Sequence, residues 1–181
     1  MGRIFSIDAS LRSTGWAVVD ETGVIATGKV TTTKTKQENV DETIVKITRD
    51  LIAIADEYHA DCIGLEDGFV GKSGKTSLQL AGLRQSIITG FYFSGRPVVS
   101  LHPSRVRSLV MKKGNAGKEE MADYIVKQYG HQPSVAALGE FNDRACKAKN
   151  SDMYDAIAIG LAVVETMKQP DLEVKVVKQH G

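Results

Sequence analysis

The chain has 181 residues, of which 42% are hydrophobic and 25% are charged, and its formal net charge is +1. These fractions are typical of a globular protein and exclude collagen-like and highly charged disordered chains. A net charge near zero neither requires nor excludes a nucleic-acid partner, because the placement of the charges decides such binding. We expect a single domain over residues 1–168, followed by a tail over residues 169–181.

The first part of the chain predicts three consecutive strands. Arg3 to Asp8 is rich in β-branched and aromatic residues, and similar runs follow at residues 15–19 and 24–33. Residues 20–23, which end in glycine, are expected to form a tight turn between the second and third strands. Short links between consecutive strands favour an antiparallel meander.

The rest of the chain alternates between helical and strand patterns. Apolar residues at helical spacing predict helices, and short β-branched runs predict strands. Residues 130–150 show no regular pattern and are expected to form a loop or an extra helical turn. The chain therefore predicts an α/β fold whose mixed sheet has a meander followed by parallel strands, with helices packed on it. The expected helices cover residues 40–55, 76–91, 103–111, 118–129 and 151–167, and the expected strands cover residues 62–66 and 97–101.

The sequence predicts neither a membrane span nor a secreted protein. No apolar run approaches the roughly 20 residues that a membrane span needs. Arg3 and Asp8 bracket only a short apolar stretch, so a secretory signal is not expected. Cys62 and Cys146 form neither a CxxC pair nor a disulfide framework, which fits a reducing compartment. We therefore expect a cytoplasmic protein without a membrane partner.

Four carboxylates fall at the ends of expected elements. Asp8 and Glu66 end two strands, and Asp152 and Asp155 share one face at the start of the last expected helix. Each acid alone could be an ordinary helix-capping or turn residue. If the four converge, their repulsion would raise their pKa values unless cations are bound. Two Mg²⁺ ions about 3.5–4 Å apart would relieve that repulsion and clamp a phosphodiester for hydrolysis, and Mn²⁺ is expected to substitute.

Four sequence blocks resemble the motifs of RuvC-type Holliday junction resolvases. Residues 5–17 (FSIDASLRSTGWA) resemble the first acidic strand of that family and the turn after it, and residues 63–69 (IGLEDGF) resemble the second acidic strand. Residues 112–118 (KKGNAGK) resemble the lysine loop of the family, and residues 152–160 (DMYDAIAIG) resemble its final helix. Each block alone is a weak signal, but the four follow the order of the family along nearly the whole chain.

The resemblance implies an RNase H-like fold with a five-stranded sheet, and a homodimer that hydrolyses four-way and other branched DNA by paired cuts, leaving 5′-phosphate and 3′-hydroxyl ends. It also implies that Lys118 lies near the scissile phosphate and that Phe69 stacks on bases at the junction centre. Ala9 and Ser10 stand where bacterial members usually have Pro-Gly, which suggests a divergent, phage-like branch. The metal-binding catalytic acids implied by the resemblance are Asp8, Glu66, Asp152 and Asp155.

Basic residues gather in two groups that flank the expected acidic site, one after the Glu66 strand and one after the fifth expected strand. Phosphates would have to approach the site from there, so these residues are candidates for DNA binding. They could equally be solvated residues of loops and helix faces. The two groups consist of Lys72, Lys75, Arg84, Arg105, Arg107, Lys112, Lys113 and Lys118.

The paired cuts that the resemblance implies also predict an oligomeric state. One active site cuts one strand, so symmetric cuts on two strands favour a homodimer with twofold symmetry. The expected helix over residues 76–91 has an apolar stripe that includes Leu80, Leu83 and Ile87, and this stripe is our candidate for the interface. The same stripe could instead pack on the sheet of its own chain.

Three other functions remain open. Residues 71–76 (GKSGKT) resemble the end of a P-loop, but Phe69 stands where the first glycine is needed, so an NTPase is an alternative and no nucleotide cofactor is expected. Asp8 and the serines and threonine after it also resemble the first phosphate loop of sugar-kinase and actin-like ATPases, which need two such domains. The third alternative is a catalytically silent protein that binds branched DNA and retains the acids as remnants.

Overall fold

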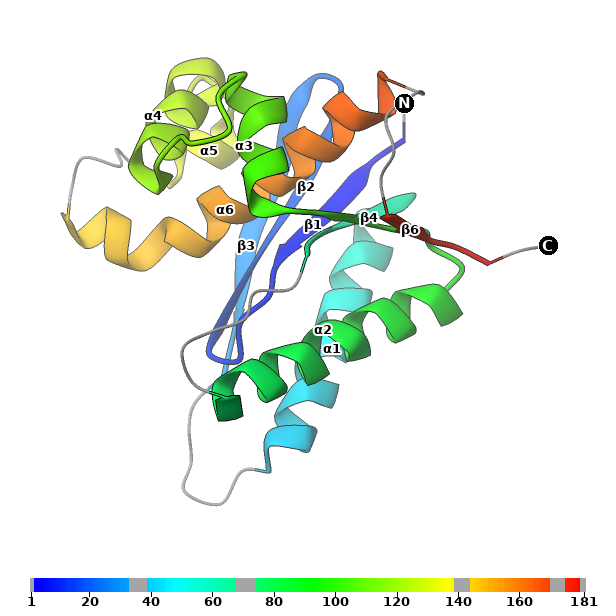
Figure 1. The fold of residues 1–181 in the computed structure, drawn as a ribbon. Coiled ribbons are helices and arrows are strands. Elements are labelled where there is room, and N and C mark those ends of the chain that lie inside the picture. The colour runs from blue at the N-terminus through cyan, green and yellow to red at the C-terminus, as the bar shows by residue number, and fades with distance from the viewer. Residues whose placement is uncertain (1, 33–38, 68–73, 139–143, 170–174, 180–181) are drawn as a thin grey trace.

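The structure is a computed structural model of the chain, and it describes residues 2–32, 39–67, 74–138, 144–169 and 175–179. A central sheet has helices on both faces, as the sequence patterns predict (Figure 1). In these parts of the chain, no helix is long and apolar enough to cross a membrane.

The sheet has six strands in the spatial order β3-β2-β1-β4-β5-β6. The first three strands of the chain form the expected antiparallel meander. The fourth strand then pairs parallel with the first, and the fifth pairs parallel with the fourth, which confirms the predicted mixed sheet. The strands are β1 (Ile4–Asp8), β2 (Ser13–Asp20), β3 (Gly23–Thr31), β4 (Cys62–Glu66), β5 (Val98–Leu101) and β6 (Lys175–Val177).

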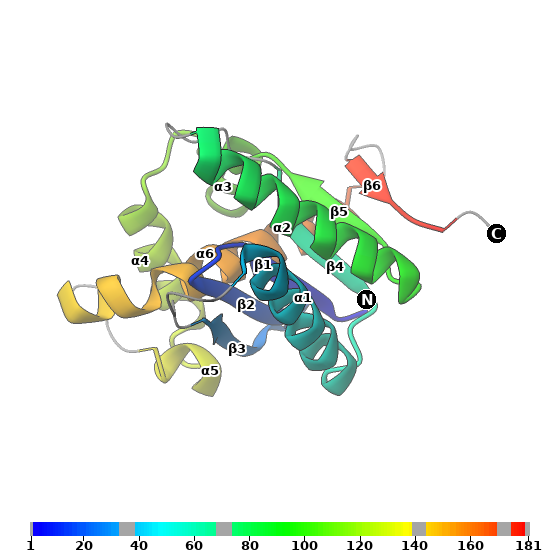
Figure 2. The ribbon, with the colours of Figure 1, turned by 90° about the horizontal axis from the view of Figure 1, so that it is seen from below.

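Helices cover both faces of the sheet and create two cores (Figures 1 and 2). On one face, α1 (Val40–Glu57) and α2 (Gly74–Phe93) pack over β1 and β4, with Phe5 and Ile87 fully buried between the layers. On the other face, α6 (Arg144–Met167) lies across β1 and β2. Beside α6 lie α3 (Pro103–Met111) and α4 (Lys118–Tyr129), and α5 (Pro133–Ala136) packs against β3 and α4.

Small residues let α6 lie very close to β1 and β2. A Cβ atom on Gly15 would collide with the backbone carbonyl of Asp152, and a Cβ atom on Gly160 would lie 2.6 Å from Oγ of Ser6. The buried hydroxyl of Ser6 also donates to the carbonyl oxygen of Ala156 at 2.7 Å. This close packing fixes the acidic part of α6 beside the carboxyl end of β1.

The last helix is longer than the sequence predicted. It begins at Arg144 rather than at Ser151, so Asp152 and Asp155 lie in the middle of α6 and are not N-terminal capping acids. The added turns, residues 144–150, consist of polar and small residues and carry no apolar stripe, which is why periodicity did not reveal them. Farther upstream, α5 supplies the extra helical turn that the sequence had left open.

The sixth strand corrects the prediction of five. Lys175–Val177 pairs antiparallel with β5, within the segment that we expected to be a tail. The strand is three residues long, and its first two residues are exposed. Such a short edge strand shows no alternation of apolar and polar residues, so it could not be predicted from the pattern of residues.

Candidate active site

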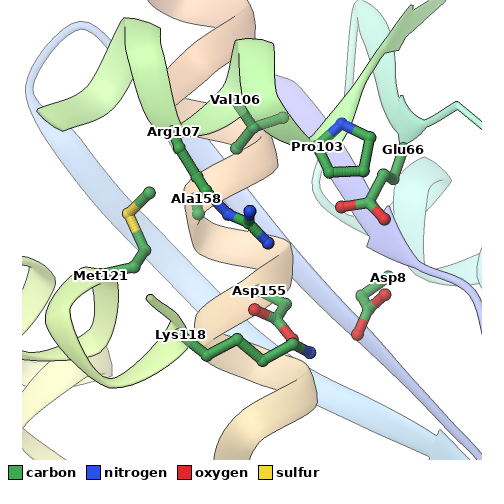
Figure 3. A pocket seen from close by; sticks show the side chains of 9 residues that line it. All are labelled: Asp8, Glu66, Pro103, Val106, Arg107, Lys118, Met121, Asp155 and Ala158. Carbon is green, nitrogen blue, oxygen red and sulfur yellow. The ribbon is translucent and has the colours of Figure 1, made fainter. Parts of the chain in front are cut away.

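A cavity of about 330 Å³ opens at the carboxyl ends of β1 and β4, where helices α3, α4 and α6 come together (Figure 3). Parallel neighbouring strands end at the same edge of a sheet, so side chains that follow them meet there. The cavity is lined by Asp8, Glu66, Pro103, Val106, Arg107, Lys118, Met121, Asp155 and Ala158.

Three of the four predicted acids point into this cavity (Figure 3). Asp8 ends β1, Glu66 ends β4, and Asp155 projects toward them from α6. Asp152 lies one helical turn earlier and does not line the cavity, although its charge acts on Asp8. The structure therefore brings Asp8, Glu66 and Asp155 together and leaves Asp152 outside the lining.

The acids alter one another's ionisation. Burial and the charge of Asp155 raise the pKa of Asp8 from 3.8 to about 8, and the charges of Glu66 and Asp152 add to this rise. Burial and the charge of Asp155 also raise the pKa of Glu66. The ammonium group of Lys118 opposes both increases. Such shifts arise where carboxylates share a poorly solvated space, and a bound cation would reverse them.

Cationic side chains from α3 and α4 face the acids. Nζ of Lys118 donates to Oδ2 of Asp155 at 2.5 Å. Burial alone lowers the pKa of Lys118, but the hydrogen bond and the charge of Asp155 outweigh it, so the pKa is raised and the ammonium group stays charged. Arg107 lines the same cavity, and its charge, like that of His102, partly offsets the rise in the pKa of Glu66. The cavity thus combines carboxylates with groups that can bind an anion.

The donor set fits a divalent cation. Among the residues that the structure describes, no three acidic, histidine or cysteine side chains stand close enough together to hold a metal ion as they are placed. Asp8, Glu66 and Asp155 nevertheless share one cavity, and carboxylate oxygens are the ligands that Mg²⁺ and Mn²⁺ prefer. The contact of Lys118 with Asp155 shows that a positive charge is already favourable at this position.

The predicted DNA-binding residues lie on three elements around the site. Lys75 is exposed at the start of α2, and Arg105 is half-buried on α3. Lys112 and Lys113, which follow α3, form ion pairs with acids of α6 and α4 at 3.8 and 2.7 Å. Two further candidates fall outside the described residues, namely Phe69 and Lys72.

The apolar stripe of α2 faces its own sheet. Leu83 and Ile87 are fully buried in the core beneath this helix, so the prediction that they form a dimer interface is wrong. Leu80 lines a second cavity, of about 360 Å³, which lies on the α2 side of Asp8 and Glu66. The sequence had left both interpretations of the stripe open, and burial decides for packing within the chain.

Arg84 is the residue whose position the sequence did not reveal. We grouped it with the basic residues that flank the site, but its side chain is only 18% exposed and is directed inward. Its Nη2 donates to Oδ1 of Asp67 at 2.9 Å, directly after β4. A charged residue among the apolar residues of a helix is the only sequence signal for such a buried contact, and that signal does not identify the partner.

Comparison with protein families gives a match over most of the chain. The model of the family described as "Crossover junction endodeoxyribonuclease RuvC" matches residues 4–164. Among curated proteins, the enzyme of that name from Ruegeria pomeroyi is 26% identical over 163 residues, which cover 88% of each chain. The one from Methylobacillus flagellatus is 28% identical over 151 residues, covering 80% of this chain and 83% of the relative.

Solved structures show the same fold. RuvC of T. thermophilus, solved in complex with a Holliday junction substrate, superposes with a TM-score of 0.78 at 18% identity, covering 98% of this chain and all of that one. The yeast mitochondrial Holliday junction resolvase Ydc2 superposes with a TM-score of 0.65 at 12% identity, covering 93% of this chain and 80% of that one. These likenesses confirm the RNase H-like fold that the motifs implied.

Proposed function

Since the chain belongs to the family of RuvC crossover junction endodeoxyribonucleases, we propose that it cleaves four-way and other branched DNA at the cavity between β1, β4 and α6. The observation that carries the proposal is the convergence of Asp8, Glu66 and Asp155 with Lys118 around one cavity. The reaction is the hydrolysis of one phosphodiester in each of two strands, leaving 5′-phosphate and 3′-hydroxyl ends. We place it in the cytoplasm of a bacterial or phage-infected cell.

The acids of the cavity are proposed to hold Mg²⁺, with Mn²⁺ as a substitute. Asp8, Glu66 and Asp155 supply carboxylate oxygens, and Asp152 adds its negative charge from the preceding turn of α6. When bound, two such ions lower the pKa of a water nucleophile and stabilise the leaving oxygen. The raised pKa of Asp8 supports this assignment, because the cavity as it stands holds more carboxyl groups than its cations balance.

The cationic residues of the cavity are proposed to position the phosphate. Lys118 stays charged because of Asp155, so it can offset the negative charge of a phosphate near neutral pH. Arg107 enters the same cavity from α3 and offers a guanidinium group, which suits bidentate contact with phosphate oxygens. Hydrogen bonding to Asp155 also holds the Lys118 ammonium group in place before DNA binds.

Contacts with the DNA arms are proposed for the basic residues around the cavity. Lys75, Arg105, Lys112 and Lys113 lie on α2, on α3 and directly after α3, on the sides from which a backbone would approach. Each phosphate contact is expected to contribute a slope of about −0.9 to the salt dependence of affinity. Phe69 and Lys72 complete the proposed set, with Phe69 stacking on bases at the junction centre.

A homodimer is proposed to supply the two cuts, through the solvent face of α2 rather than its buried stripe. Leu78 and Phe93 are both 76% exposed on this helix, and between them the outward positions carry no charged side chain. An uncharged helix face with exposed apolar side chains suits a twofold interface, where each copy presents the same patch. Leu78→Asp should give a monomer in sedimentation, whereas an unchanged mass would contradict this interface.

The function is tested with a labelled four-way junction and a linear duplex of matching sequence. Wild-type protein and Asp155→Asn are incubated with each DNA in Mg²⁺ or in chelator. We expect paired nicks in the junction only, which require Mg²⁺ and are lost in the variant.

Binding of the junction without cleavage in Mg²⁺ or Mn²⁺ would refute the nuclease and favour the catalytically silent alternative. DNA-stimulated ATP turnover by the wild type would instead support an NTPase. Equal cleavage of the linear duplex would refute the selectivity for branched DNA while keeping the nuclease.

A further inference from the structure

The guanidinium group of Arg84 ties three elements together at the carboxyl end of β4. From α2, its Nε donates to the backbone carbonyl oxygen of Glu66 at 3.3 Å, and its Nη2 donates to Oδ1 of Asp67 at 2.9 Å. The same Nη2 donates to Oγ of Ser100 on β5 at 2.8 Å. Ser100 is 5% exposed and the Arg84 side chain 18%, whereas the Asp67 side chain is 40% exposed, so the network is partly shielded from water.

The contacts of Arg84 constrain the backbone at Glu66, the last residue of β4. The backbone amide of Asp67 donates to the carbonyl oxygen of Leu101 at 2.8 Å, which extends the pairing of β4 with β5 by one step. Arg84 then fixes both the carbonyl of Glu66 and the side chain of the next residue. Because a guanidinium group is planar and donates in fixed directions, it restricts the peptide that joins Glu66 to Asp67 and hence the direction of the Glu66 side chain.

We propose that Arg84 is a positioning residue, which holds the Glu66 carboxylate at the cavity opposite Asp8 by fixing the peptide at the end of β4. This inference rests on the proposed function, because the position of the Glu66 carboxylate matters for activity only if the cavity binds a metal ion. Arg84 lines the second cavity, on the far side of Glu66 from Lys118 and Arg107, so its part is to orient Glu66 and not to contact the phosphate.

The chain contains a matched arginine at the opposite end of the sheet. Nε of Arg96 donates to the carbonyl oxygen of Ala60, just before β4, at 2.8 Å, and its Nη2 donates to Oδ1 of Asp56 at 2.6 Å. Its side chain is 18% exposed, the same as that of Arg84. The two arginine side chains are therefore equally exposed, and each links a backbone carbonyl to an aspartate. Only Arg84 adjoins an acid of the cavity.

The test compares Arg84→Met with Arg96→Met, because methionine keeps an unbranched apolar stem and removes the donors. Binding of Mn²⁺ to DNA-free protein is measured from the loss of the free Mn²⁺ signal in electron paramagnetic resonance, and kcat and KM are measured on the four-way junction. For Arg84→Met we expect binding of Mn²⁺ to weaken about tenfold, as for other residues that orient metal ligands. We also expect a lower kcat with KM within twofold of wild type.

For Arg96→Met we expect a lower Tm but Mn²⁺ binding and kcat within twofold of wild type. Arg84→Lys keeps the charge and loses the planar fork, so it should weaken Mn²⁺ binding by an intermediate factor, and it replaces Arg84→Met if that variant does not fold. Unchanged Mn²⁺ binding in the Arg84 variants beside an active wild type would overturn this inference alone. A wild type that neither binds Mn²⁺ nor cleaves the junction would overturn the proposed function as well.

Discussion

Acidic residues have different roles at the two ends of the central sheet. At the amino end, Asp61 accepts a hydrogen bond from the backbone amide of Arg3 at 2.8 Å, and Asp56 is paired with Arg96 at 2.6 Å. At the carboxyl end, several carboxyl groups meet in one cavity beside the ammonium group of Lys118. Acids at the amino end thus contribute to the fold, whereas those at the carboxyl end repel one another and suit a bound cation.

The largest expected contrast comes from removing one acid at each end. Asp8→Asn should lower junction cleavage by about a thousandfold, the scale for losing a group that stabilises the transition state. The same change should raise the Tm of the metal-free protein at neutral pH, because an amide removes the free-energy cost of burying an ionisable carboxyl group among other carboxylates. Asp61→Ala should leave cleavage unchanged and lower stability by about 1 kcal/mol. Cleavage kinetics and thermal unfolding in chelator measure both, and a lower Tm in Asp8→Asn would contradict the comparison.

Two lysines that contact acids of α6 sharpen the comparison. Lys118→Met should reduce cleavage by about a hundredfold, because Asp155 and the phosphate both lose a charged partner. Lys168 makes a similar contact with Glu165, at 2.6 Å and far from the cavity. Lys168→Met should therefore change cleavage by less than twofold. Single-turnover rates on the junction check this, and equal losses in the two variants would show that the effect is not specific to the cavity.

The close packing of α6 gives a steric test. Gly15→Ala places a methyl group against the backbone of Asp152 and should push α6 away from β1, with a cost of about 1–3 kcal/mol. Cleavage should fall about tenfold, since Asp155 moves with the helix. Gly74→Ala is the matched control, because a Cβ atom there meets nothing within 4 Å. Urea unfolding and cleavage rates should separate the variants, and normal cleavage by Gly15→Ala would contradict the role of this packing.

The last expected effect is a pH dependence of stability in the absence of metal, which is gradual and should not exceed the slope of a single proton. The pKa of Asp8 is about 8 in the folded protein, against 3.8 as its ordinary value, so the folded form retains a proton that the unfolded form releases between these pH values. Stability should therefore fall as pH rises from about 4 to 8, by at most about 1.4 kcal/mol per pH unit for one proton. Unfolding in chelator at several pH values measures the slope. Asp8→Asn should flatten it, and a rise in stability with pH that Asp8→Asn abolishes would contradict the assignment.

The sequence predicted the parts of the fold that repeat a pattern. The meander, the parallel strands and the helices with apolar stripes follow from periodicity, and the order of the four motif blocks indicated that Asp8, Glu66, Asp155 and Lys118 would meet. What it missed depends on contacts between distant residues. The start of α6 has no apolar stripe, and β6 is too short to alternate.

The contacts of Arg84 could also not be predicted from the sequence. Its partners, Asp67 and Ser100, lie directly after β4 and on β5, and no spacing rule connects them to a position on α2. The interface predicted for Leu83 and Ile87 failed for a related reason. An apolar stripe shows that a helix face is buried, but only the packed structure shows that the burying surface belongs to the same chain.

The place of β6 has a consequence for how the chain acquires its structure during synthesis. β6 pairs with the outer edge of β5, yet it is translated after α6 and after every other strand of the sheet. Until the ribosome has released it, the backbone amides and carbonyls of β5 face solvent on that edge, in a form that another nascent chain could pair with. The outer edge of β5 is therefore paired later than the other strands described, and a pause in translation before Lys175 would prolong its exposure.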